Sequence, residues 1–247
     1  MKKIVGVIPL RYESSRLPGK PLRDICGKPM VWWVYQVARK VPGLTESIVA
    51  TDNECVVSVC KELDIPTIMT SKQWINGTER VAEVASRIAA DLYVTMQGDE
   101  PLLEPLVVQK VIDIMLNDNR VQCATLKTAY RNPVDVVNGT TPKVVCDANN
   151  DVMLFSRAPI PYPKASLNYI YYKAIGVYAF RPETLSIYSS LPPGAIERIE
   201  DIELLRLLEN GVKIRIAEVE SDTIAVDTEK DLDRVRNYLI KKNEQLF

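Results

Sequence analysis

The chain has 247 residues, of which 47% are hydrophobic and 26% are charged, and its 31 basic and 32 acidic side chains nearly cancel. This length and hydrophobic content exclude a disordered chain and predict one domain over 1–247 with a sizeable core. The near-zero net charge argues against a general nucleic-acid binder, which carries a basic surplus.

The sequence contains no histidine. Ser-His-Asp triads, Cys-His dyads, histidine-ligated zinc sites and a histidine general base are therefore excluded. The five cysteines are scattered and form no CxxC pair, which is typical of reduced thiols. The first apolar run, residues 4–9, is too short for a signal segment, and no run reaches membrane-spanning length. We expect a cytoplasmic protein with no membrane or nucleic-acid partner.

The first half of the sequence alternates apolar runs with helical segments. The runs that predict strands are residues 4–9, 47–50, 67–69 and 91–96. The segments that predict helices are residues 30–40, 53–63, 78–90 and 105–116. We expect Thr78 to cap the third of these helices. The alternation predicts an α/β fold with a mainly parallel sheet covered by helices.

The second half is richer in predicted β-structure. The expected elements are a hairpin of residues 143–146 and 152–155, a proline-rich loop at 158–163, strands at 175–180 and 213–218, and helices at 199–210 and 229–242. We expect a core formed by residues 1–130 and 205–247, with a β-rich insertion at 131–204.

Polar side chains follow three of the predicted strands. They belong to residues 11–20, to Thr51 and Asp52, and to residues 97–101. In open parallel sheets, ligands bind at the carboxyl ends of the strands. We therefore expect these three segments to meet at one edge and to form the ligand site.

The first of these loops carries three cations, Arg11, Arg16 and Lys20, with Ser14 and Gly19 beside them. Guanidinium, ammonium and hydroxyl groups next to a small residue suit a polyphosphate. The loop matches neither the P-loop pattern nor GxGxxG. Its spacing is equally compatible with a solvated basic loop between a strand and a helix.

Two carboxylates, Asp99 and Asp227, each come shortly after an apolar run. Mg²⁺ prefers such oxygen ligands, usually one or two carboxylates together with substrate phosphates. A structural alternative is that Glu100 and Asp227 are helix N-caps. The sequence pattern alone leaves both interpretations open.

Eight short runs, in order along essentially the whole chain, resemble the 3-deoxy-manno-octulosonate cytidylyltransferases, also called CMP-Kdo synthetases. The runs are RYESSRLPGKPL (11–22), GKPM (27–30), ATD (50–52), GTER (77–80), QGDEP (97–101), FSR (155–157), GVY (176–178) and VDT (226–228). The resemblance implies a Rossmann-like nucleotidyltransferase fold. It also implies transfer of CMP from CTP to the anomeric hydroxyl of a 3-deoxy-2-keto sugar acid, with release of pyrophosphate, for surface polysaccharide or lipopolysaccharide synthesis.

The resemblance also implies roles for individual residues. Those for CTP are Arg11, Ser14, Arg16, Lys20, Asp52, Asn76, Gly77, Arg80 and Gln97; those for the sugar acid are Gln97, Arg157, Tyr178 and Glu203. The implied magnesium ligands are Asp99 and Asp227, and the catalytic set is Arg11, Lys20, Asp99 and Asp227. It further implies a homodimer, with residues 1–130 and 205–247 binding the nucleotide and residues 131–204 serving sugar binding and dimerisation. Tyr178 as strand core and Glu203 as a solvated helix residue remain alternatives.

The chain departs from the family at three polar positions. Trp74 and Ala174 stand where members commonly have histidine, and Leu204 stands where glutamine is usual. An apolar pocket wall tolerates the loss or replacement of a hydroxyl, so the preferred sugar could be a modified 3-deoxy-2-keto acid. Two other functions stay open: a CTP- or sugar-acid-binding regulatory protein without turnover, and a CMP-sialate-type synthetase.

Overall fold

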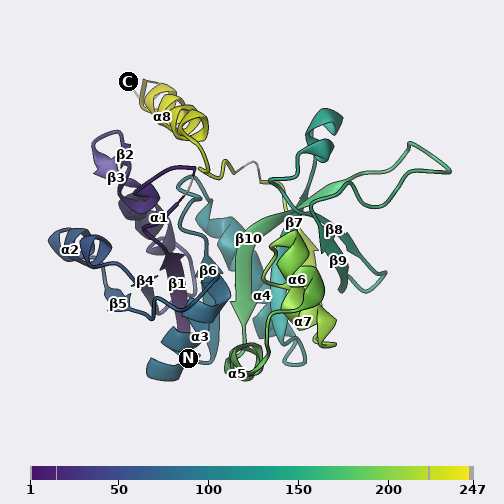
Figure 1. The fold of residues 1–247 in the computed structure, drawn as a ribbon, viewed down its shortest axis with the longest axis horizontal. Coiled ribbons are helices and arrows are strands. Elements are labelled where there is room, and N and C mark those ends of the chain that lie inside the picture. The colour runs from purple at the N-terminus through teal and green to yellow at the C-terminus, as the bar shows by residue number, and fades with distance from the viewer. Residues whose placement is uncertain (1, 15, 222, 245–247) are drawn as a thin grey trace. The chain divides into compact units, whose positions relative to one another are not determined.

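The computed structural model describes residues 2–14, 16–221 and 223–244 (Figure 1). The chain divides into two compact units, 1–109 with 223–247, and 110–222. The division falls within helix α4 (Pro105–Asn117). None of the helices in the described part of the chain is both long and apolar enough to cross a membrane.

The first unit contains a four-stranded parallel sheet. Its strands are β1 (Ile4–Leu10), β4 (Glu46–Thr51), β5 (Thr67–Met69) and β6 (Leu92–Met96), in the order β6-β1-β4-β5. Every residue of β1 and β6 is buried, as expected for parallel strands that are covered on both faces. The prediction of an α/β fold with a mainly parallel sheet is confirmed.

Helices connect these strands, as the sequence predicts. They are α1 (Met30–Ala38), α2 (Glu54–Glu62) and α3 (Gly77–Arg87), and α8 (Glu229–Glu244) lies near the end of the chain. The short elements η1 (Lys20–Leu22), β2 (Asp24–Ile25) and β3 (Lys28–Pro29) were not predicted. The prediction that Thr78 caps α3 is wrong. The cap is Asn76, whose side chain accepts a hydrogen bond from the Glu79 amide at 2.9 Å.

A small apolar cluster connects the start and the end of the first unit. Its buried members are Leu17, Ile25, Met30, Val226, Leu232, Val235 and Leu239. Leu17 lies three residues before Lys20, and Val226 directly precedes Asp227. Burial of Leu17 and Val226 in one cluster therefore brings two segments together that are more than 200 residues apart in the sequence.

The second unit contains a mixed sheet. Its strands are β7 (Cys123–Ala129), β8 (Lys143–Cys146), β9 (Val152–Ser156), β10 (Tyr172–Phe180) and β11 (Ile214–Glu218). β7 pairs antiparallel with β10 and parallel with β11. β8 and β9 form the predicted hairpin. Because β7 and β11 belong to this sheet, the second compact unit extends beyond the expected insertion 131–204.

The helices of the second unit are α5 (Pro182–Ser190), α6 (Ala195–Glu200) and α7 (Leu205–Glu209), with a 3-10 segment, η2 (Pro133–Val137). The prediction of one helix over 199–210 is wrong, because the chain turns at Asp201, which has a φ of 50°. The carbonyls of Glu200 and Asp201 accept hydrogen bonds from the Arg157 guanidinium. A continuous helix would need those carbonyls for its own hydrogen bonds.

Candidate active site

The three polar segments follow adjacent parallel strands of the first unit. β1 leads into residues 11–19, β4 ends at Thr51 before Asp52, and β6 leads into residues 97–101. β1 pairs with β4 on one side and β6 on the other. The prediction that these segments lie at the carboxyl edge of one sheet is therefore confirmed.

Lys20 lies between two carboxylates. Its ammonium donates to Oδ2 of Asp99 at 2.6 Å and to Oδ1 of Asp227 at 3.1 Å. Nη2 of Arg16 is 3.1 Å from the same oxygen of Asp227. The side chains of Lys20, Asp99 and Asp227 are 15%, 29% and 29% exposed. The cluster is thus held by its own charges while its carboxylates stay accessible to water.

The backbone aligns the two carboxylates. The amide of Val226 donates to the carbonyl of Asp99 at 2.8 Å, which places residue 227 beside residue 99. A side chain at Gly98 would overlap Leu10 at the end of β1, so glycine allows this segment to pack closely against the sheet. Gly19 has a φ of 66°, a conformation that glycine adopts readily, and it precedes η1, which begins with Lys20.

Asp227 does not cap α8. Thr228 and Asp231 form a reciprocal cap instead: the Thr228 amide donates to Oδ2 of Asp231 at 3.0 Å, and the Asp231 amide donates to Oγ1 of Thr228 at 3.3 Å. The capping interpretation of Asp227 is therefore wrong. Its carboxylate oxygen accepts from Lys20 instead. In the sequence, this cap is indicated by the acidic residue three positions after Thr228.

Three other polar residues of the first loop lie nearer the surface. Arg11 and Arg16 are exposed, and Ser14 is half-buried. Oγ of Ser14 accepts a hydrogen bond from the Leu17 amide at 3.3 Å. Arg16 contacts Asp227, so it can contribute a cation on the solvent side of the cluster.

A second ion pair follows β4. The guanidinium of Arg80 binds the carboxylate of Asp52 and donates to Oγ1 of Thr70 at 2.8 Å. The Arg80 side chain is only 5% exposed. Asn76 and Gly77 lie at the start of α3, where Asn76 serves as the cap, and Gln97 is half-buried after β6. The pair fixes the start of α3 relative to the end of β4.

The expected sugar residues belong to the second unit. The guanidinium of Arg157 donates to the carbonyls of Glu200, Asp201, Gly139 and Thr140. These bonds use most of its N–H groups. Arg157 would therefore have to break some of these hydrogen bonds to bind a substrate carboxylate through two N–H groups. Tyr178 is half-buried next to an irregularity in β10, and Glu203 is half-buried between α6 and α7.

Glu200 positions Arg157 and was not predicted from the sequence. Its carboxylate accepts from the Ser156 hydroxyl at 2.6 Å and from the Arg157 amide at 2.8 Å. Burial alone would raise the pKa of Glu200, but these hydrogen bonds and nearby cations outweigh it and lower the pKa. More than 40 residues separate Glu200 from these partners, so no local pattern could reveal the contact.

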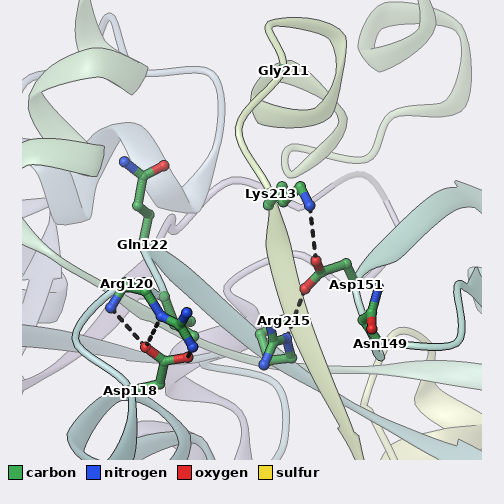
Figure 2. A pocket seen from close by; sticks show the side chains of 9 residues that line it. Asp118, Arg120, Gln122, Asn149, Asp151, Gly211, Lys213 and Arg215 are labelled. Atoms are coloured by element: carbon green, nitrogen blue, oxygen red, sulfur yellow. Dashed lines mark hydrogen bonds and ion pairs between the residues drawn. The ribbon is translucent and has the colours of Figure 1, made fainter.

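The second unit also contains a pocket of about 590 Å³, shown in Figure 2. Asp118 is paired with Arg120, and Asp151 accepts from Nε of Arg215 at 2.7 Å and lies 3.4 Å from Nζ of Lys213. None of the predicted site residues is among its lining residues in the described chain. The pocket is therefore separate from the residues that the sequence predicts for the site.

Known proteins are similar to this chain over most of its length. A model of the cytidylyltransferase family matches residues 5–214. The chain is 40% identical to the 3-deoxy-manno-octulosonate cytidylyltransferase of Fusobacterium nucleatum, over 98% of both chains. It is 44% identical to the enzyme of that name from Koribacter versatilis, over 98% of this chain and 92% of the relative.

The chain belongs to the 3-deoxy-manno-octulosonate cytidylyltransferase family. A solved structure of a CMP:2-keto-3-deoxy-manno-octonic acid synthetase complexed with CTP superposes with a TM-score of 0.92 and 41% identity. The superposition covers 97% of this chain and 99% of that one. The fold and the family agree with the resemblance seen in the sequence.

The carboxylate oxygens around Lys20 suit a divalent cation such as Mg²⁺. Asp99 and Asp227 both approach a single ammonium, so their oxygens already converge on one cationic position. In the described part of the chain, no group of three or more Asp, Glu, Cys or His side chains could hold a metal. Two carboxylates completed by phosphate oxygens and water are the arrangement that Mg²⁺ favours.

Two of the departures from the family have structural explanations. Leu204 is only 1% exposed and belongs to the core of the second unit. The indole of Trp74 donates to the carboxylate of Glu83 in α3. Ala174 is half-buried on β10, directly opposite Lys127 of β7.

Proposed function

We propose that this chain transfers CMP from CTP to the anomeric hydroxyl of 3-deoxy-manno-octulosonate and releases pyrophosphate. The observation that carries the proposal is the cluster of Lys20 with Asp99 and Asp227 at the carboxyl edge of a parallel sheet. Relatives across almost the whole chain carry the name of this activity. The cluster combines a phosphate-binding cation with two carboxylates, which a nucleotidyl transfer needs.

The cations of the first loop would bind the triphosphate. Lys20 already lies within hydrogen-bonding distance of two carboxylate oxygens, and phosphate oxygens can replace them as its partners. Arg11 and Arg16 are exposed, and Arg16 shares the carboxylate of Asp227 with Lys20. In the reaction, these cations stabilise the negative charge that collects on the leaving pyrophosphate.

Asp99 and Asp227 would hold Mg²⁺. Bound there, the ion would supply neutralisation of phosphate charge and a lower pKa for the attacking sugar hydroxyl. A histidine base is therefore unnecessary, which fits a chain without histidine. Until phosphate oxygens take over Lys20, its ammonium keeps both carboxylates aligned.

The remaining residues would recognise the two substrates. Asp52, Asn76, Gly77 and Arg80 are proposed for the cytidine, Ser14 for the triphosphate, and Gln97 for the junction of nucleotide and sugar. Arg157, Tyr178 and Glu203 are proposed for the sugar acid. Ala174 in place of a polar residue favours a modified 3-deoxy-2-keto acid as an additional or preferred substrate.

The quaternary structure and cellular setting are further parts of the proposal. We propose a homodimer formed through the second unit, where large apolar side chains such as Val137, Tyr162 and Leu167 are 73%, 84% and 87% exposed. All five cysteines are free, which suits the reducing cytoplasm. The product would serve lipopolysaccharide or other surface polysaccharide synthesis.

The decisive experiment measures pyrophosphate release from CTP with a panel of sugar acids, with and without Mg²⁺. We expect turnover only with Mg²⁺ and a 3-deoxy-2-keto acid, and a loss of about 10²–10³-fold in Asp99→Asn. CTP binding without turnover on any acid would favour a regulatory protein, and turnover only with sialate would favour the other synthetase. If ordinary 3-deoxy-manno-octulosonate gives by far the highest efficiency, the altered sugar preference is wrong.

A further inference from the structure

Two lysines are buried in the second unit, and their surroundings differ. Lys143 of β8 is completely buried, and its ammonium donates to the carbonyls of Asn138, Thr141 and Arg157 at 2.7, 3.1 and 2.7 Å. Three acceptors match the three N–H donors of an ammonium. Lys143 is therefore a satisfied structural lysine.

Lys127 of β7 lacks such a set of acceptors. It is only 7% exposed, and its one hydrogen-bond partner among the described residues is Sγ of Cys146, 2.9 Å from Nζ. The ammonium also lies 4.4 Å from the centre of the Tyr172 ring. Thiol sulfur is a weak acceptor, and buried donors are normally well satisfied. Hydrogen bonding alone thus does not explain why this amine is directed at a sulfur atom.

The fold keeps the two atoms together. β7 pairs with β10 on one side and with β11 on the other, so the backbone of Lys127 is fixed on both sides. Cys146 is the last residue of β8, next to a register irregularity in the β8–β9 hairpin, and it is half-buried. A small oxidant can therefore reach the sulfur, while the amine is shielded from bulk water.

We propose that Lys127 and Cys146 are a modification site at which peroxide creates a covalent bridge through one oxygen atom, Nζ–O–Sγ. One N–H and the S–H bond break, and N–O and S–O bonds form. The amine nitrogen and the thiol sulfur each lose two electrons. Two molecules of hydrogen peroxide accept these four electrons, leaving one oxygen atom in the bridge and three molecules of water.

The bridge would join residues 19 positions apart, on two strands of one sheet. Like a disulfide, it would restrict the unfolded chain and raise the melting temperature. Two molecules of dithiothreitol return four electrons, restore the amine and the thiol, and release the oxygen as water. The modification is therefore reversible, unlike the sulfinic and sulfonic acids to which an unpartnered thiol proceeds.

The test treats the full chain with hydrogen peroxide and maps the digested peptides by mass spectrometry. The protein used for the test carries Cys26→Ser and Cys55→Ser, which remove the two exposed thiols and leave Cys146 as the most accessible one. We call this variant the background protein. We expect the peptides of Lys127 and Cys146 to be joined, with a mass gain of one oxygen less two hydrogens. Dithiothreitol should separate them, and the rise in melting temperature should disappear with the bridge.

Matched variants distinguish the bridge from ordinary thiol oxidation. Lys127→Arg keeps a positive charge beside the thiol but offers no amine, and Cys146→Ser removes the sulfur; neither should give joined peptides. The proposal is overturned if Cys146 of the background protein gains oxygen atoms while Lys127 stays unmodified. A link that has lost two hydrogens without gaining oxygen, a direct N–S bond, would also overturn it.

Discussion

Two groups of opposite charges, the Lys20 cluster of the first unit and the Arg206–Glu197 pair of the second, differ in their access to water. In the first unit, Lys20 lies between Asp99 and Asp227, and these side chains are 15–29% exposed. In the second unit, Arg206 and Glu197 are 2% and 6% exposed and joined by two hydrogen bonds of 2.8 Å. The guanidinium of Arg206 also lies 4.2 Å from the centre of the Tyr188 ring.

The difference in burial suits a structural role for the Arg206–Glu197 pair and the functional role that we propose for the Lys20 cluster. Glu197 also accepts from the Gly194 amide at 2.9 Å, so its oxygens are occupied by the protein itself. A substrate cannot reach this pair without opening the core. The cluster around Lys20 pairs its charges without excluding water, so a metal or a phosphate can exchange for one of the partners.

The largest effect on stability should come from breaking the buried pair. Arg206→Met leaves the Glu197 carboxylate without its guanidinium in the core, so we expect the free energy of unfolding to fall by about 3–5 kcal/mol. Urea unfolding measures this loss. Adding Glu197→Gln to this variant should restore part of the lost free energy of unfolding. The structural role is contradicted if Arg206→Met loses no more stability than the substitution of an exposed arginine.

Removing the cation of the open cluster should affect activity and leave stability nearly intact. In Lys20→Met, we expect kcat/KM for pyrophosphate release to fall about 10²–10³-fold, because an ammonium that stabilises the departing phosphates is lost. Unfolding by urea should shift little, since partly exposed pairs contribute about 0–1 kcal/mol. If Lys20→Met lowered the stability as severely as the activity, the two charged groups would no longer differ in role.

A side chain at Gly98 tests how closely the open cluster depends on packing. In Gly98→Ala, the new Cβ would overlap the side chain of Leu10, which is 4% exposed and cannot move into solvent. We expect the unfolding free energy to fall by about 1–3 kcal/mol and kcat to fall as Asp99 is displaced. Thermal unfolding and steady-state kinetics measure both, and unchanged kinetics would show that residue 99 tolerates the shift.

The helix cap beside Asp227 should have a smaller effect. Thr228→Ala removes the hydroxyl that accepts from the Asp231 amide, so we expect a loss of about 1 kcal/mol in the free energy of unfolding. Activity should change far less than in Lys20→Met, because Asp227 keeps its contact with Lys20. Thr228→Ser is the matched control and should behave like the unmodified chain in both measurements.

The pair of the half-buried Asp118 and the exposed Arg120 should have the smallest effect. Hydrogen bonds from the Arg120 side chain and amide lower the pKa of Asp118 to about 2. Because this value is below the ordinary 3.8, the pair favours the folded state above that pH, and the contribution disappears as the pH falls through about 2. An NMR titration should give a midpoint near 2, and Asp118→Asn should lower the melting temperature at pH 7 only slightly, because solvent screens the pair.

Periodic features of the sequence predicted the first unit well. Alternating apolar runs and helical segments located β1, β4, β5, β6 and the helices between them, because burial on both faces leaves a continuous apolar pattern. The second unit was harder to predict. β7 and α5 went unrecognised, and the break at Asp201 depends on carbonyls that bind Arg157, more than 40 residues away.

The sequence by itself determined the chemistry that is available to this protein. Without histidine, a cation-rich loop and two isolated carboxylates were left as the candidate site, and the order of the motifs indicated the family. Only the tertiary structure decided which carboxylate caps a helix and which one faces Lys20. It also decided that Leu204 belongs to the core and that Lys127 contacts Cys146. These outcomes depend on burial and on contacts between distant residues, which arise only when the chain packs and which no local pattern encodes.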